Sequence, residues 1–402
     1  MTRSQSFARK IAPLTLLFLL ARLVMAAAYH GGVEGHLNQV DFSVFYNAAQ
    51  DLRNHQPIYL DQRSYYVYSP FLALMLRPLT SLPVDQAANL WTLIEVVLLA
   101  ACAILFCVSN RLSPIEHATM YALVFITAFR FWPTTLELSI GNVDIVVLFL
   151  IVLMYWAERG KRFYILSLLI AVAALIKTWM LGMVFYLLVR RKYREAAATM
   201  LAFAIGMFAL FAICGFDQFT EFLRQTHKFS YQPSLVTHSI PGIAFMFFHA
   251  NPHIPPVTTR PEIYWTFLIG AYAILIAGLL AVWRRGRDDS PGAGQRLLGI
   301  TIISLLLGNT VCHQYYFVLV LPVIWTILLQ PSGDRSPLEL AAVLVALVVY
   351  IAFSIPTPSL TPVPDIYQHG IKKFLILTSF SGTFTLWATM LVLLLRPATK
   401  KT

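Results

Sequence analysis

Charged residues are scarce in this chain. Asp, Glu, Lys and Arg make up 12% of its 402 residues, whereas a soluble globular protein carries about 25%. The hydrophobic content of 58% and the mean hydropathy of +0.68 depart in the same direction. The alternating pattern of a membrane barrel is absent, while apolar stretches of roughly 17–25 residues recur along the whole length. Because backbone amides in lipid must bond internally, these stretches predict an all-α polytopic membrane protein.

Motifs for metals and nucleotides are also lacking. The sequence has no HExxH and no Gly-rich dinucleotide fingerprint. Its four cysteines, Cys102, Cys107, Cys214 and Cys312, show no CxxC and no zinc spacing, so we interpret them as small apolar residues. Cys214 and Cys312 fall near predicted extracytoplasmic helix ends, and whether they pair stays open. We therefore predict no metal and no cofactor.

The net charge of +11 does not indicate a nucleic-acid partner. Its basic residues form short clusters between apolar segments, where they act as topology signals. Their bias predicts that both termini lie on the cytoplasmic side of the membrane. The apolar run from Ile11 follows a basic start but has no clear cleavage site, so we interpret it as a retained first span. The clusters are at 159–162, 190–194 and 284–287.

The apolar segments predict about twelve spans within one membrane-embedded domain over residues 1–402. They lie at 11–29, 88–108, 117–131, 143–158, 163–177, 178–190, 195–215, 263–283, 297–312, 316–330, 338–355 and 373–395. No inverted repeat relates the two halves, which argues against a secondary transporter.

Two extracytoplasmic loops, 30–87 and 216–262, are long and rich in aromatic residues and proline. Asp41 to Asn54 predicts an amphipathic helix, and Phe71 to Leu76 a second short apolar one that ends near Pro78. Loops of this kind are typical of a cover over an active site. The apolar face of the first helix consists of Phe42, Phe45, Tyr46 and Ala49.

Ionisable groups in or beside spans are costly, so each is a functional candidate. Asp41 is equally a helix N-cap or a reactive carboxylate. Lys177, in an apolar hairpin, either reaches to the interface or holds an anion. The connection between the third and fourth spans is either an ordinary polar turn or part of a site. Its polar residues are Arg130, Glu137, Asn142 and Asp144.

Nearly all of the ten histidines fall on the predicted outer side. Long polar loops explain most of them, but His313 stands at the mouth of two apolar spans, and His238 is our second choice. Residues far apart in sequence are thus assigned to one face: Asp41, Arg130, Lys177, His238 and His313. A carboxylate base with several cations suits activation of a hydroxyl and departure of a phosphate.

Short blocks along the chain carry a family resemblance. In order and spacing they resemble the bacterial polyprenyl-phosphate-mannose-dependent mannosyltransferases, glycosyltransferase family 87 of the GT-C superfamily. Departures at Ser69, Asp144, Thr178 and His238 leave the donor sugar and the acceptor open. The blocks are Asp-Phe-Ser-Val-Phe-Tyr at 41–46, Pro-Ile-Tyr at 57–59, Tyr-Val-Tyr-Ser-Pro-Phe at 66–71, Pro-Leu-Thr-Ser-Leu-Pro at 78–83, Gly-Asn-Val-Asp at 141–144, Ala-Ala-Leu-Ile-Lys-Thr at 173–178, His-Ser-Ile-Pro-Gly at 238–242 and His-Gln-Tyr-Tyr at 313–316.

The resemblance implies a GT-C-like helical bundle and an inverting sugar transfer on the outer leaflet. The donor would be a hexose, mannose in the first place, on a polyprenyl phosphate, and the acceptor a glycolipid or polysaccharide. Asp41 occupies the place of the family's catalytic base, and Lys177, Arg130 and His313 are candidates to stabilise the departing phosphate. The other candidate substrate-binding residues are Tyr68, Asn142, Asp144 and His238.

Two other functions stay open from the residues alone. A transporter or flippase for a lipid-linked or anionic substrate would also need buried cations, but along a path through the membrane. The one-sided placement of the charges favours the enzyme. A polymerase or ligase of lipid-linked oligosaccharides would share the predicted architecture and differ in its acceptor.

Overall fold

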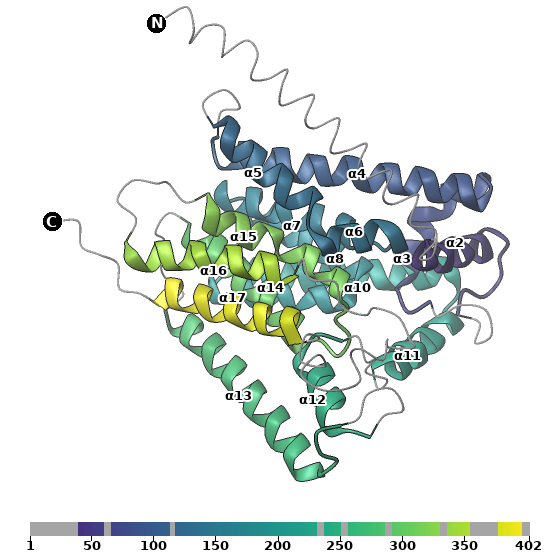
Figure 1. The fold of residues 1–402 in the computed structure, drawn as a ribbon. Coiled ribbons are helices and arrows are strands. Elements are labelled where there is room, and N and C mark those ends of the chain that lie inside the picture. The colour runs from purple at the N-terminus through teal and green to yellow at the C-terminus, as the bar shows by residue number, and fades with distance from the viewer. Residues whose placement is uncertain are drawn as a thin grey trace, which may run out of the picture. The chain divides into compact units, whose positions relative to one another are not determined.

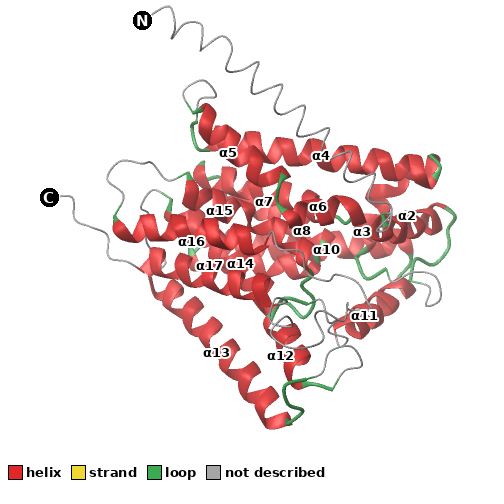
Figure 2. Cartoon of the chain, in the orientation of Figure 1, coloured by secondary structure: helices red, strands yellow, loops and turns green. Residues whose placement is uncertain are grey.

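The structure of the protein is a computed structural model. It describes residues 39–59, 66–112, 117–230, 237–250, 256–285, 292–329, 336–353 and 377–395. Across these ranges every regular element is a helix and no strand occurs (Figure 2). The predicted all-α class is therefore confirmed. The predicted first span at 11–29 lies outside the described residues.

The other predicted spans fall on helices, but their number as spans is not confirmed. Among the described residues, three helices are long and apolar enough to cross a membrane: α4 (Val84–Ser109), α10 (Tyr193–Cys214) and α13 (Pro261–Arg285). Several predicted spans are shorter apolar helices. Thus 178–190 consists of a 3-10 turn, η2 (Thr178–Met183), followed by α9 (Val184–Val189).

The chain divides into two compact units, each described here by itself. The first consists of residues 1–178 and 203–225, and the second of 179–202 and 226–402. The first unit includes α2 (Val40–Arg53), α3 (Pro70–Leu76), η1 (Arg77–Ser81), α4, α5 (Ala118–Phe129), α6 (Trp132–Ile140), α7 (Asp144–Arg159), α8 (Phe163–Ile176) and most of α11 (Asp217–Ser230). The second includes α9, α12 (Ile240–Phe248), α13, α14 (Ala293–Gly308), η3 (Gln314–Val320), α15 (Leu321–Leu328), α16 (Pro337–Phe353) and α17 (Leu377–Leu395).

Long apolar helices form the centre of the first unit. Helix α4 packs along α7, and α7 along α8 (Figure 1). The aromatic rings of Phe106 on α4 and Tyr155 on α7 pack together, with their centroids 5.9 Å apart. Both side chains are almost fully buried, so this contact excludes solvent from the middle of the unit.

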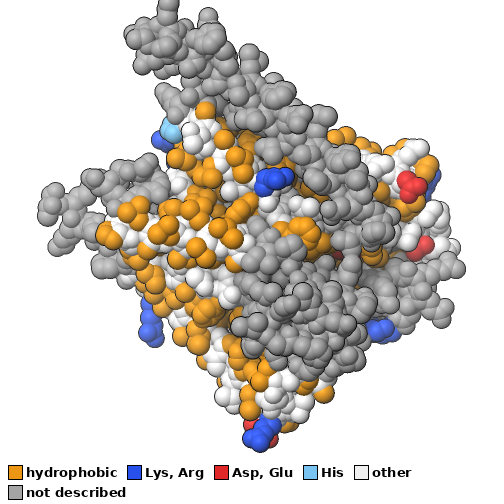
Figure 3. Space-filling model, viewed as in Figure 1, with side chains coloured by type: hydrophobic (Ala, Val, Ile, Leu, Met, Phe, Trp, Pro, Cys, Tyr) orange, Lys and Arg blue, Asp and Glu red, His pale blue; other side chains and the backbone are white. Residues whose placement is uncertain are grey.

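The second unit packs α14 and α16 against α17. Trp387 on α17 donates its indole N–H to the Ser304 hydroxyl on α14 at 3.0 Å, which satisfies a buried donor. Large hydrophobic side chains are exposed along α13 and α16 (Figure 3), among them Ile269 and Leu344. Exposed apolar surface of this extent is typical of helices that face lipid.

Helix α2 confirms the amphipathic helix predicted from the sequence. Its apolar positions recur at helical spacing, and Phe42, Phe45 and Tyr46 are buried. The helix lies against α3 and η1 (Figure 1). The Tyr46 hydroxyl donates to the Leu82 carbonyl at 2.8 Å. These contacts hold α2 against α3 and η1.

The second predicted outer helix is also present, as α3 followed by the 3-10 turn η1. Ser69 caps α3 by accepting from the Phe71 amide, and Pro70 occupies the first turn, where its missing N–H costs nothing. The Ser69 hydroxyl also donates to the Leu175 carbonyl of α8. One short serine thus starts a helix and joins it to the core.

Helix α6 ends at its C-cap Gly141, which lies close to Gln39 and Phe42 at the start of α2. Gly141 has φ +66°, a left-handed conformation that ends the helix. A Cβ on Gly141 would lie 2.1 Å from Gln39 Oε1 and 2.8 Å from Phe42 Cβ. Gln39 in turn donates to Thr92 Oγ1 and to the Leu138 carbonyl. Glycine is therefore required at this position for two independent reasons.

Replacing Gly141 by alanine is expected to destabilise the protein by about 1–3 kcal/mol, because alanine is strained at positive φ and its methyl group displaces Phe42. The measurement is the thermal unfolding midpoint of the detergent-solubilised protein. Gly270→Ala is the matched control, since nothing lies within 4 Å of a Cβ there. Equal midpoints for the two variants would contradict the prediction.

Candidate active site

Asp41 lies in the first turn of α2, and it is not the N-cap. That position belongs to Gln39, whose φ is 49°. The cap alternative for Asp41 is therefore wrong, because α2 begins at Val40 and Asp41 is already its second residue. Instead, Asp41 Oδ2 accepts a hydrogen bond of 2.5 Å from Asn142 Nδ2.

Asn142 is held in one orientation by the turn between α6 and α7. Its Oδ1 accepts from the Val143 amide at 2.6 Å and from the Tyr68 hydroxyl at 3.3 Å. Its backbone carbonyl accepts from the Trp91 indole at 3.4 Å. Because two donors fix the oxygen, the amide nitrogen must face Asp41. Asn142 is almost fully buried, so solvent does not compete for these bonds.

Asp144 and Lys177 form a buried ion pair. The Lys177 ammonium lies 2.7 Å from Oδ1 and 2.8 Å from Oδ2 of Asp144, and the two residues are 3% and 0% exposed. Asp144 is the first residue of α7, and Lys177 follows the end of α8. The ammonium is also 5.7 Å from the centre of the Tyr68 ring. The pair therefore joins two helix ends beside the tyrosine that contacts Asn142.

Two further buried carboxyls lie near this pair. Glu137, on α6, is fully buried, and its Oε1 accepts from the Asp144 amide at 2.5 Å. Burial, with the neighbouring Asp144 carboxylate as a second cause, raises the pKa of Glu137 well above its usual value. Glu95, on α4, is also fully buried, and its carboxyl oxygens have no hydrogen-bond partner among the described residues.

The structure brings five of the predicted site residues together in the first unit: Asp41, Tyr68, Asn142, Asp144 and Lys177. Arg130 is also in this unit, exposed at the end of α5. Gln218 of α11 accepts from the Ile58 amide at 3.1 Å, so residues from both predicted outer loops meet here.

His238 and His313 lie in the second unit. The His238 amide donates to the Cys312 carbonyl at 2.7 Å, which joins the two predicted histidine segments. His238 is fully buried, whereas His313 is half-buried and stacks on Tyr315 at 5.2 Å. No disulfide bond is formed among the described residues, which include Cys102, Cys107, Cys214 and Cys312.

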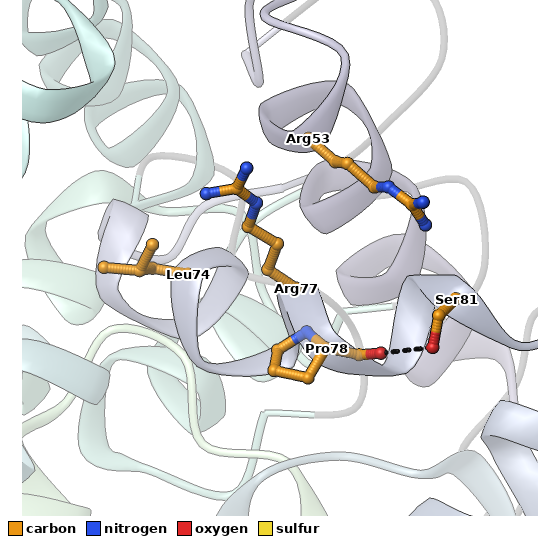
Figure 4. A pocket seen from close by; sticks show the side chains of 5 residues that line it. All are labelled: Arg53, Leu74, Arg77, Pro78 and Ser81. Carbon is orange, nitrogen blue, oxygen red and sulfur yellow. Dashed lines mark hydrogen bonds between the residues drawn. The ribbon is translucent and has the colours of Figure 1, made fainter.

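A surface pocket of about 360 Å³ lies at the other end of α2 (Figure 4). It is lined by Arg53, Leu74, Arg77, Pro78 and Ser81. Arg53 donates to the Thr80 carbonyl at 2.7 Å, and Ser81 to the Pro78 carbonyl at 2.8 Å. None of the predicted site residues lines this pocket, so it is separate from the cluster around Asn142.

Sequence reasoning missed two residues of this cluster. Glu95 is an ionisable residue inside an apolar helix, a signal that by itself marks a candidate. Gln39 carried no such signal, because a glutamine in an outer loop is ordinary. Its contacts with Thr92 and Leu138 depend on the packing of α4 and α6 against the start of α2.

Comparisons with known proteins identify the family to which the sequence is similar. The sequence profile of glycosyltransferase family 87 matches residues 66–308. An α-(1→3)-arabinofuranosyltransferase of Corynebacterium glutamicum is 25% identical over 81% of this chain and 73% of its own. A polyprenol-phosphate-mannose-dependent α-(1-2)-phosphatidylinositol pentamannoside mannosyltransferase of Mycolicibacterium smegmatis is 25% identical over 84% of this chain and 79% of its own. No solved structure matches the chain.

Breaking the ion pair from one side is expected to be more damaging than removing both partners. Lys177→Met leaves Asp144 buried and uncompensated, at a cost of about 3–5 kcal/mol, whereas the double variant with Asp144→Leu recovers most of that loss. Thermal unfolding in detergent measures both. Lys161→Met, at an exposed lysine, is the control. A single variant as stable as the wild type would refute the role of the pair.

Proposed function

The chain belongs to glycosyltransferase family 87, and on this premise we propose that it transfers a sugar from a polyprenyl-phosphate donor to an acceptor hydroxyl with Asp41 as the base. The reaction is proposed for the extracytoplasmic face of the membrane. The observation that carries the proposal is the bond from Asn142 to the Asp41 carboxylate, next to the buried Asp144–Lys177 pair. Membership of an enzyme family also removes the reason to prefer a transporter or flippase.

In the proposed step, the Asp41 carboxylate takes the proton of the acceptor hydroxyl. The acceptor oxygen attacks the anomeric carbon of the donor as the bond from that carbon to the phosphate oxygen breaks. The phosphate leaves with the electron pair of this bond, still attached to its lipid, and the anomeric configuration is inverted. A base acts at hydrogen-bond range, so the orientation of the Asp41 carboxylate by Asn142 favours this role.

The departing phosphate is proposed to be stabilised by protein cations. Lys177 is the first candidate, and its pairing with Asp144 means that its charge is partly balanced before any donor binds. Arg130, at the end of α5, is the second candidate in the first unit. His238 and His313 stay sequence predictions for contacts with the substrate.

The proposed substrates follow the relatives. One is named for a polyprenol-phosphate-mannose donor and a phosphatidylinositol-mannoside acceptor, and the other for arabinofuranosyl transfer. A hexose, with mannose first, is therefore the proposed sugar, and a glycolipid or polysaccharide the proposed acceptor. Offering both labelled polyprenyl-phosphate sugars to the same membranes separates mannose from arabinofuranose.

Asp41→Asn is expected to lower transfer by about 100-fold or more, because it removes the base while an amide can still pair with Asn142. The measurement is transfer of label from radiolabelled polyprenyl-phosphate mannose in membranes that contain equal amounts of folded protein. Asp85→Asn, at an exposed aspartate in the first turn of α4, is the control and should keep full activity. Wild-type activity in Asp41→Asn would show that another group is the base.

Transfer is expected to be unchanged by EDTA, since protein cations, and no bound metal ion, are proposed to stabilise the departing phosphate. The measurement compares initial rates in washed membranes before and after chelation. Activity that EDTA removes and that Mg²⁺ or Mn²⁺ restores would contradict this part of the proposal. A rate that chelation leaves unaltered agrees with it.

A further inference from the structure

The proposed reaction assigns no role to Glu137, yet this residue lies within the cluster around Asn142 and Asp144. Its carboxyl is fully buried on α6, and Oε1 accepts from the Asp144 amide, the first residue of α7. The first amides of a helix have no partner within the helix. A carboxyl oxygen from the preceding helix supplies one here, and it does so from seven residues earlier in the chain.

The hydrogen bond from the Asp144 amide to Glu137 closes the short turn that contains Asn142. Gly141, with its left-handed φ, ends α6 at one side of this turn, and Asp144 begins α7 at the other. Asn142 lies between these two fixed points. Its own side chain accepts from the Val143 amide, so the position of the amide group follows the position of the turn.

We propose that Glu137 is a positioning residue that acts through the Asp144 amide and Asn142 to hold the Asp41 carboxylate in the orientation needed for proton transfer. This inference rests on the proposed role of Asp41 as the base. In this arrangement the Asp144 amide and Asn142 link Glu137 to Asp41. The misplacement of a reacting group by about 1 Å can cost roughly 100-fold in rate, so a residue two steps away can matter.

The charges around Glu137 favour its neutral form. The groups that face it are Asp144 of α7, Lys177 after α8, Asp41 of α2 and Glu95 of α4. Lys177 is the one cation of this set and is already paired with Asp144. A buried, unpaired carboxylate is costly, and burial raises the pKa of Glu137 accordingly. A neutral acid accepts from the Asp144 amide through its carbonyl oxygen, which a glutamine can imitate.

The experiment uses the full-length protein in proteoliposomes and measures kcat, KM and the pH profile of kcat/KM per folded molecule. Glu137→Gln should keep kcat within about 3-fold. Glu137→Ala should lower kcat by about 10-fold or more at unchanged donor KM. The acid limb of its profile should move to higher pH by roughly half a unit, because the Asp41 carboxylate loses a hydrogen bond that favours its charged form. Asp85→Asn, at an exposed carboxyl outside the cluster, should leave both quantities unchanged.

A double-variant cycle tests whether Glu137 acts through Asn142. Asn142→Ala alone should reproduce the loss in kcat and the shift of the acid limb. Adding Glu137→Ala to Asn142→Ala should change kcat by no more than about 2-fold and should not shift the acid limb further. The reason is that the effects of residues in one network are not additive. Independent, multiplying effects would overturn the inference. So would a Glu137→Ala variant whose kcat and acid limb match the wild type, which would make Glu137 a purely structural cap.

Failure of this inference is distinguishable from failure of the proposed function. If Asp41→Asn is as active as the wild type, the base is wrong, whatever Glu137 does. If Asp41→Asn is inactive while Glu137→Ala is normal, only the positioning role is lost. Should Glu137→Ala not fold, Glu137→Asp replaces it, because the shorter side chain keeps the acid but cannot reach the Asp144 amide. Wild-type kcat in that variant would also overturn the inference.

Discussion

The buried ion pair between Asp144 and Lys177 is the interaction on which the rest of the site depends. It joins the first residue of α7 to the residue after α8 with contacts of 2.7 and 2.8 Å. Removing one partner of such a pair leaves an uncompensated charge in a low-dielectric interior. The α7 end of the connection between α6 and α7 is thereby fixed, and Asn142 within this connection contacts Asp41.

An excess of buried acid surrounds this pair. Glu137 and Glu95 add two buried carboxyls beside the single lysine of the pair. A charge without a partner is costly in a buried, low-dielectric environment. Glu137 therefore serves best as a neutral acceptor for a helix amide. Asp41 differs from Glu137, because its proposed role as the base requires the charged carboxylate.

The family match covers the cluster only in part. It runs over residues 66–308 and so includes Tyr68, Asn142, Asp144 and Lys177, but not Asp41. Asp41 enters the site through a hydrogen bond across 101 residues, from α2 to the turn before α7. Close packing between these elements, as at Gly141 and Phe42, gives Asp41 a defined place although it precedes the matched segment.

The sequence by itself determined the helical class, most of the long apolar helices and the buried face of α2, because these follow from local periodicity and from the need of backbone amides to bond within lipid. It also identified Asp41, Asn142, Asp144 and Lys177 as candidates, since polar groups among apolar spans are costly. Only the tertiary structure decided their pairing: Lys177 with Asp144, Asn142 with Asp41, and Glu137 with the Asp144 amide. These contacts join residues of different helices, and their distances depend on how α4, α6, α7 and α8 pack, which no local pattern encodes.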